Sequence, residues 1–302
     1  MRVFVTGASG HIGSAVVPEL LRTGHQVVGL ARSDSSAAAL ASAGAEARRG
    51  DLDDLDGLRE AAAEADGVIH LAFKHEAMRS GDFPGAISAD LGAIQAIGAA
   101  LEGSGKPFVS TSGTLMLASA GIAGRPGTEQ DVLQAGPRID AENTVIALAE
   151  HGVRSSVVRL APLVHSTLDH HGFGPALIGI ARDTGVSGYV GDGSNRWPAV
   201  HTLDAARLYR LALESAPAGT RLHGVADEGV PFRDIAGVIG RHLGVPTAGI
   251  APEDADEHFS YLGHFASLDN PVSSEITREL LGWQTDHPGL IEDLEQGHYF
   301  EQ

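Results

Sequence analysis

The first half of the chain alternates short apolar runs with segments of helical spacing. Apolar runs that are typical of buried strands lie at residues 2–6, 26–30, 45–49, 67–72, 107–111 and 154–160. Between them, apolar residues recur every three or four positions, which predicts helices at 11–22, 55–64, 83–101 and 137–150. Strands separated by helices pair in parallel through crossovers, so the pattern predicts an α/β fold with a doubly wound parallel sheet.

The second half of the chain is less regular. Helical spacing is found at 172–183, 202–215, 232–243 and 273–281, and short strands are expected only near 188–190 and 220–225. This change of pattern predicts a smaller appended region. Because no long linker or low-complexity tract separates the halves, we expect them to pack closely.

Composition limits the classes of function. The 302 residues can bury a sizeable core, and 21 Lys plus Arg against 39 Asp plus Glu leave a net charge of -18, which disfavours nucleic acid as a partner. No apolar run approaches the length of a membrane span, and no signal sequence is recognisable, so we expect a soluble, cytoplasmic protein with no membrane partner. The absence of cysteine excludes disulfides and thiolate metal sites.

A glycine-rich turn follows the first predicted strand. Residues 6–13 read TGASGHIG and place Gly7, Gly10 and Gly13 between that strand and the opening of a helix. Gly7 permits the sharp turn, Gly10 lets a diphosphate approach the backbone, and Gly13 lets the helix pack on the strand. The turn therefore predicts a dinucleotide site at a helix N-terminus, the alternative being a tight turn without a ligand.

Two polar residues at the ends of the next strands bear on the choice of dinucleotide. Arg32 stands where an acidic residue would bind a ribose 2′-hydroxyl, and a guanidinium there favours a 2′-phosphate. The sequence thus predicts NADP(H) in preference to NAD(H), although Asp34 is close and Arg32 can also be read as a solvated surface residue. Asp51 can accept from the adenine amino group or cap the following helix.

Together these segments resemble the short-chain dehydrogenase/reductase superfamily, specifically its extended epimerase/dehydratase-like branch. Besides the glycine turn, the likeness rests on Arg32, Asp51-Leu52, HLA at 70–72, STS at 110–112, RLAPLVH at 159–165 and WPAVHTLD at 197–204. It implies a Rossmann domain at 1–164, to which 200–227 returns, and a smaller α/β region at 165–302 for a small-molecule substrate. Homodimers are common among such proteins. The cofactor contacts that it implies are Gly7, Ser9, Gly10, His11, Ile12, Gly13, Arg32, Asp51, Leu52, Leu71, Ala72 and Phe73.

The chain lacks the residues that transfer protons during catalysis in this family. Relatives use a Tyr and a Lys four residues apart after the fifth strand, but all four tyrosines of this chain lie later. One register puts Gln134 at the Tyr position and Arg138 at the Lys position; a second puts Arg138 and Glu142 there. Arg138 can hold the ribose and nicotinamide side electrostatically, but its pKa is too high for a proton relay. Alternatively, it forms a surface pair with Glu142.

Other polar residues are candidates for the missing chemistry. Ser112 is expected to bind a substrate carbonyl, or else to form a turn or helix cap. His165, and after it His171, can donate a proton near neutral pH, the alternative being loop or structural roles. The neighbouring histidines lack the spacing of a zinc site, so no metal is expected.

One carboxylate interrupts an apolar helix stripe. Asp90 falls at helical spacing among the apolar residues of the stripe, which are Phe83, Ile87, Ile94, Ile97 and Leu101. An unpaired buried charge is costly. We therefore expect Asp90 to position a water or basic partner near Ser112 or Arg138, to carry a raised pKa as an acid, or to bond backbone for structural reasons. Lys74 can add a cation to the cofactor crevice or remain a solvated loop residue.

Three functions follow from these features. The first is an NADP(H)-dependent oxidoreductase that reduces a ketone or aldehyde of a small organic substrate. The second is a regulatory sensor that binds NADP(H) without turnover, and the third is a non-redox epimerase or lyase on the same scaffold. The intact dinucleotide motif and the retained Ser112 favour the first, whereas the absent Tyr and Lys favour the second.

Overall fold

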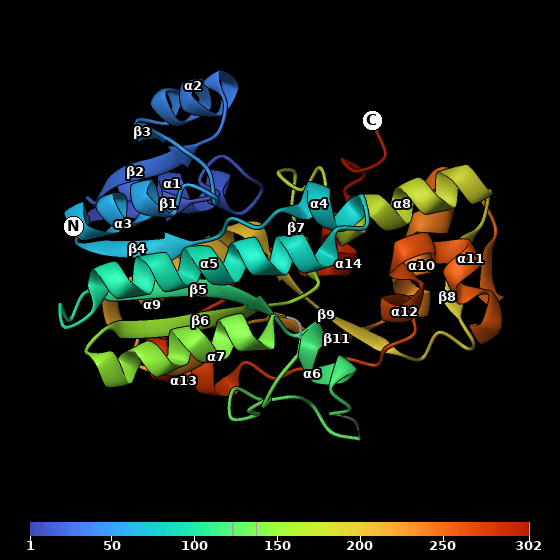
Figure 1. The fold of residues 1–302 in the computed structure, drawn as a ribbon. Coiled ribbons are helices and arrows are strands. Elements are labelled where there is room, and N and C mark those ends of the chain that lie inside the picture. The colour runs from blue at the N-terminus through green and yellow to red at the C-terminus, as the bar shows by residue number, and fades with distance from the viewer. Residues whose placement is uncertain (123, 137, 302) are drawn as a thin grey trace.

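A seven-stranded parallel sheet forms the centre of the computed structural model, which describes residues 1–122, 124–136 and 138–301 and, within these, all side chains except 78 and 79 (Figure 1). Its strand order is β3-β2-β1-β4-β5-β6-β10. The bounds are β1 (Arg2–Thr6), β2 (Gln26–Ala31), β3 (Glu46–Arg49), β4 (Gly67–His70), β5 (Pro107–Gly113), β6 (Arg154–Leu160) and β10 (Thr220–Gly224). The order reverses between β1 and β4, which creates a crevice at the carboxyl ends of these strands.

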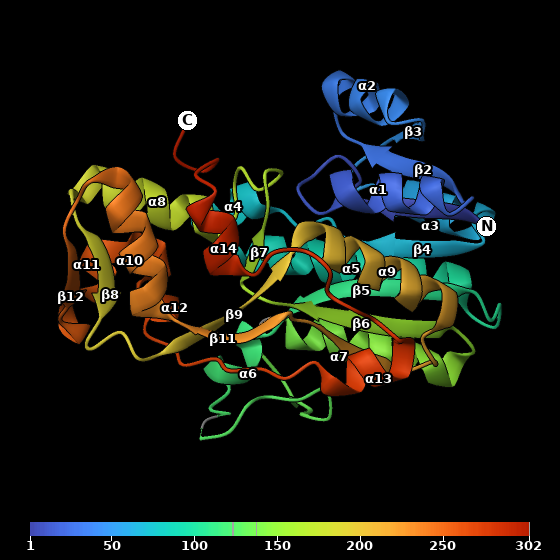
Figure 2. The same ribbon diagram turned by 180° about the vertical axis from the view of Figure 1, so that it is seen from behind.

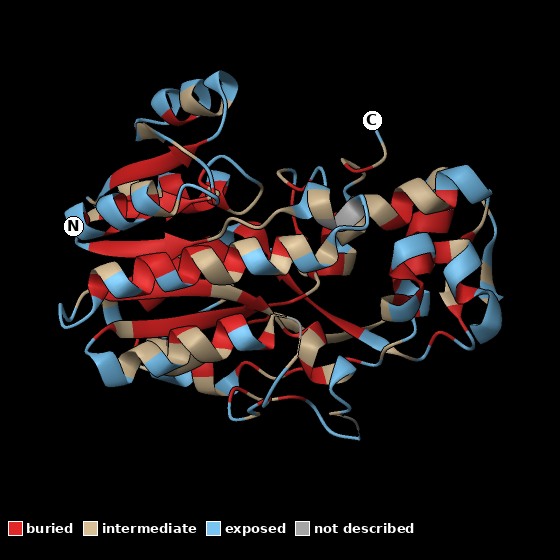
Figure 3. Ribbon diagram, in the orientation of Figure 1, coloured by how far each residue is buried: buried red, intermediate tan, exposed pale blue. Residues whose placement is uncertain are grey.

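Helices cover both faces of this sheet. In β1, Val3 and Val5 pack into the core beneath α1 (Gly13–Arg22) and α9 (Thr202–Ser215), whereas Phe4 packs toward α3 (Leu55–Glu64), α5 (Phe83–Leu101) and α7 (Ile139–Ala147). Successive side chains of a strand point to opposite faces, so β1 contributes to two apolar cores. Figure 3 shows the inner strands of the large sheet buried and the helices exposed on their outer sides, whereas the edge strand β3 is partly exposed.

The second region lies beyond the carboxyl ends of the strands. It contains a three-stranded sheet of β7 (Leu163–His165), β9 (Arg196–His201) and β11 (Asp227–Pro231), and a pair of β8 (Ser187–Val190) and β12 (Thr247–Ile250). Around its own apolar core pack α8 (Phe173–Thr184), α10 (Phe232–Leu243) and α14 (Leu290–Glu295) (Figure 2). The remaining elements are α2 (Asp34–Ser42), α4 (His75–Arg79), α6 (Leu115–Ser119), α11 (Ala255–Phe259), α12 (Gly263–Ala266), α13 (Glu275–Leu281) and the 3-10 turns η1 (Leu148–His151), η2 (Pro252–Asp254) and η3 (Ser260–Leu262).

The doubly wound sheet expected from the sequence is confirmed, with differences at element ends. The predicted helix at 137–150 begins as α7 at Ile139 and ends as the 3-10 turn η1; residue 137 lies outside the described part. The predicted strand at 220–225 is β10, which ends one residue earlier, at Gly224, and pairs in parallel with β6 in the large sheet. Strands β7, β9, β11 and β12 and helix α2 were not predicted, because they are short or lack a clear period.

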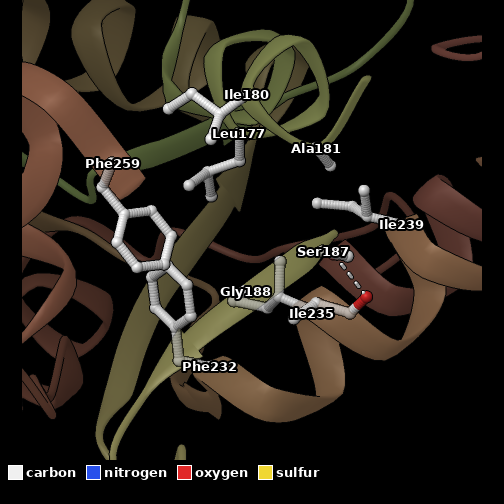
Figure 4. A pocket seen from close by; sticks show the side chains of 10 residues that line it. Leu177, Ile180, Ala181, Ser187, Gly188, Phe232, Ile235, Ile239 and Phe259 are labelled. Carbon is white, nitrogen blue, oxygen red and sulfur yellow. Dashed lines mark hydrogen bonds between the residues drawn. The ribbon is translucent and has the colours of Figure 1, made fainter. Parts of the chain in front are cut away.

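A small apolar cavity lies inside the second region, between α8, β8 and α10 (Figure 4). Leu177, Phe232 and Phe259 line it, and Ser187 satisfies its hydroxyl by donating to the carbonyl of Ala236. Its free space of about 10 Å³ is room for roughly one water molecule, and its lining is apolar. The cavity is therefore a packing feature and not a substrate site. Across the described residues, no helix is both long and apolar enough to cross a membrane.

Candidate active site

The glycine turn between β1 and α1 is closely packed. Gly7 has a φ of 66°, and a side chain there would place its Cβ 2.8 Å from the amide nitrogen of Ala72. A Cβ on Gly13 would collide with the carbonyl oxygen of Gly7, and one on Gly10 would lie 3.2 Å from the same oxygen. Only glycine fits these positions without displacing backbone. The turn is therefore shaped by close approach of backbone to backbone, as the motif predicted.

The same turn leaves backbone donors free. Among the described residues, none accepts a hydrogen bond from the amides of His11 and Ile12, and α1 has no side-chain cap. These amides stand at the N-terminus of a helix, where partial positive charge favours an anion, at the point where the strand order reverses. The turn fits the diphosphate of a dinucleotide, which would be held by backbone rather than by side chains.

Two arginines, Arg32 and Arg49, lie at the carboxyl ends of the neighbouring strands β2 and β3. Arg32 is exposed directly after β2, and Arg49 ends β3, where it is the register partner of Ala31. Arg49 pairs at 3.3 Å with Asp34, whose side chain is fully exposed. Arg49 was not singled out from the sequence, although its place at the end of a predicted strand was a usable signal. The two strand ends together offer positive charge to a phosphate.

Asp51 and Lys74 both make local contacts. Asp51 accepts from the amide of Asp53 at 2.7 Å, while the cap of α3 is Asp54, which accepts from Gly57. The alternative that Asp51 caps this helix is therefore wrong. Lys74 donates to Asp53 at 2.7 Å, so its charge is matched outside the crevice.

A buried chain of polar side chains runs along the carboxyl ends of β1 and β4. The hydroxyl of Thr6 lies 2.8 Å from Nδ1 of His70, and Nε2 of His70 lies 3.2 Å from Asp90, on α5. Asp90 is 2% exposed and stands 4.0 Å from the guanidinium of Arg138. Asp90 is thus bonded through a side chain rather than backbone, and it does lie beside Arg138. His70 is a member of the site that sequence reasoning did not assign.

Arg138 adopts a left-handed backbone conformation, with φ of 63°, just before α7. Its guanidinium donates to the carbonyl of Thr111 at 3.1 Å and lies 4.1 Å above the ring of Phe73. Backbone strain of this kind costs of order 1–3 kcal/mol and persists only where surrounding contacts impose it. A fixed cation is therefore held between the ends of β4 and β5. On the other side of β5, the fully buried Tyr209 bonds the Thr111 hydroxyl at 2.8 Å, and burial raises the pKa of this phenol.

The surface pair between Arg138 and Glu142 does not form. Glu142 is buried and accepts from Arg159 at 2.6 Å and from Arg221 at 2.7 Å. Burial by itself raises the pKa of Glu142, but these guanidiniums and the neighbouring Ser112 hydroxyl hold the pKa below its usual value. The structure therefore gives Glu142 a buried ionic role beneath the crevice, which corrects the surface alternative.

Ser112 sits near the carboxyl end of β5, 6% exposed. Its Oγ is close enough to Glu142 to lower the pKa of that carboxyl, but no atom of the described residues meets normal hydrogen-bond geometry with this Oγ. A buried hydroxyl without a partner is unusual in a native protein. The Ser112 hydroxyl can therefore serve a ligand.

The two candidate histidines differ in access. His165, in β7, is 2% exposed; its Nδ1 is 2.9 Å from Asp293, and its Nε2 is buried without a partner. His171 is exposed in the loop before α8. The sequence ranked His165 before His171 as the proton donor. By accessibility the ranking is the opposite, because His171 can be reached by a substrate whereas His165 is enclosed. Among the residues that the structure describes, no hydrogen bond joins either ring to Ser112, and no cluster of metal-ligating side chains is found.

Three comparisons bear on this arrangement. The model of the NAD dependent epimerase/dehydratase family matches residues 3–223. An uncharacterized protein of Schizosaccharomyces pombe is 47% identical over 99% of this chain and 100% of its own length, and a 2-alkyl-3-oxoalkanoate reductase of Stenotrophomonas maltophilia is 29% identical over 82% and 77%. A structure of dTDP-glucose 4,6-dehydratase from Streptomyces venezuelae, with NAD and TYD bound, aligns with a TM-score of 0.77 and 20% identity over 100% of this chain and 97% of that one.

Proposed function

The chain belongs to the NAD dependent epimerase/dehydratase family, and from this premise we propose that it is an NADP(H)-dependent oxidoreductase that reduces a ketone or aldehyde of a small organic substrate. The observation that carries the proposal is the unpartnered Ser112 hydroxyl on the strand two places from the diphosphate turn. Neighbouring strands are about 4.8 Å apart, so the two features are separated by roughly 10 Å across the sheet. A dinucleotide that lies with its diphosphate on the turn can span that distance.

The chemistry is divided between cofactor and chain. When bound, a reduced nicotinamide would supply a hydride, with both electrons, to the carbonyl carbon. Ser112 donates a hydrogen bond to the carbonyl oxygen and so polarises the double bond. A protonated imidazole, for which exposed His171 is better placed than enclosed His165, delivers a proton to that oxygen and becomes neutral. The products are the alcohol and the oxidised cofactor.

Arg138 and Asp90 act on the geometry of this site. The stacking of the guanidinium on Phe73 and its bond to the Thr111 carbonyl hold a positive charge beside the ends of β4 and β5. Such a charge stabilises negative charge that develops on the substrate oxygen or on the ribose side. Asp90, tied to His70, limits where the guanidinium can move. The arrangement provides electrostatic support without a phenol.

The preference for NADP(H) is supported by Arg32, directly after β2, and by Arg49, the last residue of β3 and the register partner of Ala31. A 2′-phosphate would meet two guanidiniums there, whereas a free ribose would gain little. The similarity to a 2-alkyl-3-oxoalkanoate reductase supports a carbonyl substrate. A cytoplasmic location, a homodimer, and the division into 1–164 with 200–227 and 165–302 remain predictions from the sequence.

The test is a single-turnover measurement. NADPH bound to the protein is mixed with a panel of ketones and aldehydes, and the absorbance of the reduced nicotinamide is followed. We expect consumption with at least one carbonyl, strongly slowed in Ser112→Ala and unchanged in Ser119→Ala, which alters an exposed serine of α6. Binding without consumption by any carbonyl would favour a sensor, and turnover of a substrate with unchanged cofactor would favour a non-redox epimerase or lyase.

A further inference from the structure

His11 connects the diphosphate turn to the second region. Its Nε2 lies 2.9 Å from the hydroxyl of Thr202, the first residue of α9, and its Nδ1 lies 3.5 Å from Oδ1 of Asp169, in the loop before α8. Both partners lie more than 150 positions after His11 in the sequence. The ring is only 20% exposed, so its two nitrogens depend on these partners.

Counting hydrogens settles which nitrogen of the neutral ring carries the proton. The hydroxyl of Thr202 contacts the carbonyl oxygen of His165 at 3.1 Å, the hydroxyl of Ser166 at 2.9 Å, and His11. A carbonyl oxygen can only accept, so the single hydrogen of Thr202 is directed to His165. Ser166 and Nε2 of His11 must then donate to Thr202. The Nδ1 atom of neutral His11 is left as an acceptor that faces a carboxyl group.

Asp169 is placed to supply the missing hydrogen. Its Oδ1 accepts from the amide of Gly172 at 2.8 Å, and its Oδ2 accepts from the hydroxyl of Tyr299 at 3.3 Å. The residue is 3% exposed, and burial raises the pKa of Asp169 to about 6. Burial lowers the pKa of His11 to about 4, helped by the neighbouring His170, His165 and His171. An ionised Asp169 and an unprotonated Nδ1 of His11 are both hydrogen-bond acceptors, and two acceptors repel each other. A proton on one of the two groups is therefore needed for them to attract each other.

We infer that Asp169 and His11 hold one proton between them, and that this shared proton fixes the diphosphate turn against the second region and strengthens dinucleotide binding. The inference rests on the proposed binding of a dinucleotide at the turn. When the proton leaves, a negative charge remains beside the segment that must receive a diphosphate, and the link to Asp169 turns from attraction to repulsion. Binding of the diphosphate therefore draws a proton onto the pair.

Other titratable side chains surround Asp169 and His11, and an experiment on the shared proton must control for them. His165 approaches from β7, His170 and His171 flank Asp169 in its own loop, and Tyr299 faces it from the C-terminal segment. Asp293, on α14, is held by His165 and His298, and its charge helps to raise the pKa of Tyr299. Protonation of His170 or His171 would also favour a diphosphate in acid, so the experiment must separate these rings from Asp169.

The test is calorimetric titration with NADPH between about pH 5.5 and about pH 8, in two buffers of different ionisation enthalpy at each pH. A pair whose pKa rises by about one unit on binding gives roughly tenfold tighter binding at the acid end, with proton uptake between these limits. In Asp169→Asn the amide oxygen keeps the bond to Gly172, so no donor is placed toward His11. We expect most of the proton uptake to be lost in this variant, and the pH dependence of the dissociation constant to fall to the part that the neighbouring imidazoles and the 2′-phosphate contribute.

The matched control is the double variant His170→Gln with His171→Gln, which removes the neighbouring imidazoles and should retain most of the uptake. Uptake that is undiminished in Asp169→Asn, or that is lost in the double glutamine variant, would overturn the shared proton. Tight binding by the wild type with no pH dependence would do the same while leaving the proposed function intact. Failure of the wild type to bind NADPH at any pH would instead contradict the proposed function itself.

Discussion

Replacing Arg32 by aspartate tests the part of the site that chooses between the two dinucleotides. The guanidinium is exposed directly after β2, whereas Arg49, the last residue of β3, is already paired with Asp34 at 3.3 Å. A hydrogen bond to a charged group contributes about 1.5–3 kcal/mol, which corresponds to a factor of roughly 10–150 in affinity. The introduced carboxylate also repels a 2′-phosphate and can accept from a 2′-hydroxyl, so the ratio of NADPH to NADH affinity should fall by at least the lower factor.

The assay is a fluorescence titration with both reduced dinucleotides at a fixed low ionic strength, because salt screens exposed charges. The control is Arg48→Asp, which changes the neighbouring residue of β3. The side chain of Arg48 turns to Glu60 and Glu64 on α3, at 2.9 and 3.1 Å, so its loss should not change the ratio. Equal affinity ratios in Arg32→Asp and the wild type would refute the assignment of Arg32 to the phosphate.

Three further changes address the turn, the buried ion pair and the proton donor. Gly10→Val should abolish dinucleotide binding in the same titration, because its branched side chain would cover the turn and press on the carbonyl of Gly7, while circular dichroism should remain that of a folded chain. Glu142→Gln should lower the free energy of unfolding by about 3–5 kcal/mol in urea, because it leaves two guanidiniums without a carboxylate; the exposed Glu60→Gln should cost under about 1 kcal/mol, and equal costs would contradict a buried pair. If neither His171→Ala nor His165→Ala slows single-turnover reduction at neutral pH, the proton comes from another group.

Much of the architecture could be predicted because its signals are local. The periods of apolar residues predicted α3, α5, α9 and α10 at their observed bounds, since each helix buries one stripe that its own sequence displays. The turn was predicted for a similar reason, because the close approach at Gly7 and Gly13 excludes any side chain. The position of Asp90 in an apolar stripe correctly indicated a buried carboxylate, although its partner His70 was not foreseen.

Contacts between distant segments could not be read in the same way. A carboxylate such as Glu142 carries no local mark that distinguishes a surface pair from burial between Arg159 and Arg221, because its partners arrive from two other strands. His165 looked like a reactive loop histidine, and only the packing of α14 shows that Asp293 holds it in the interior.

The amino-acid order by itself determined the alternating elements, the glycine turn and the classes of ligand that charge permits, because each of these depends on residues within about one turn or strand of one another. The tertiary structure decided which polar groups meet. It brought β10 beside β6, fixed Arg138 in a left-handed conformation above Phe73, and carried Asp169 to His11. Burial and hydrogen-bond pairing depend on contacts between distant segments, and these contacts form only when the sheet and the second region pack against each other.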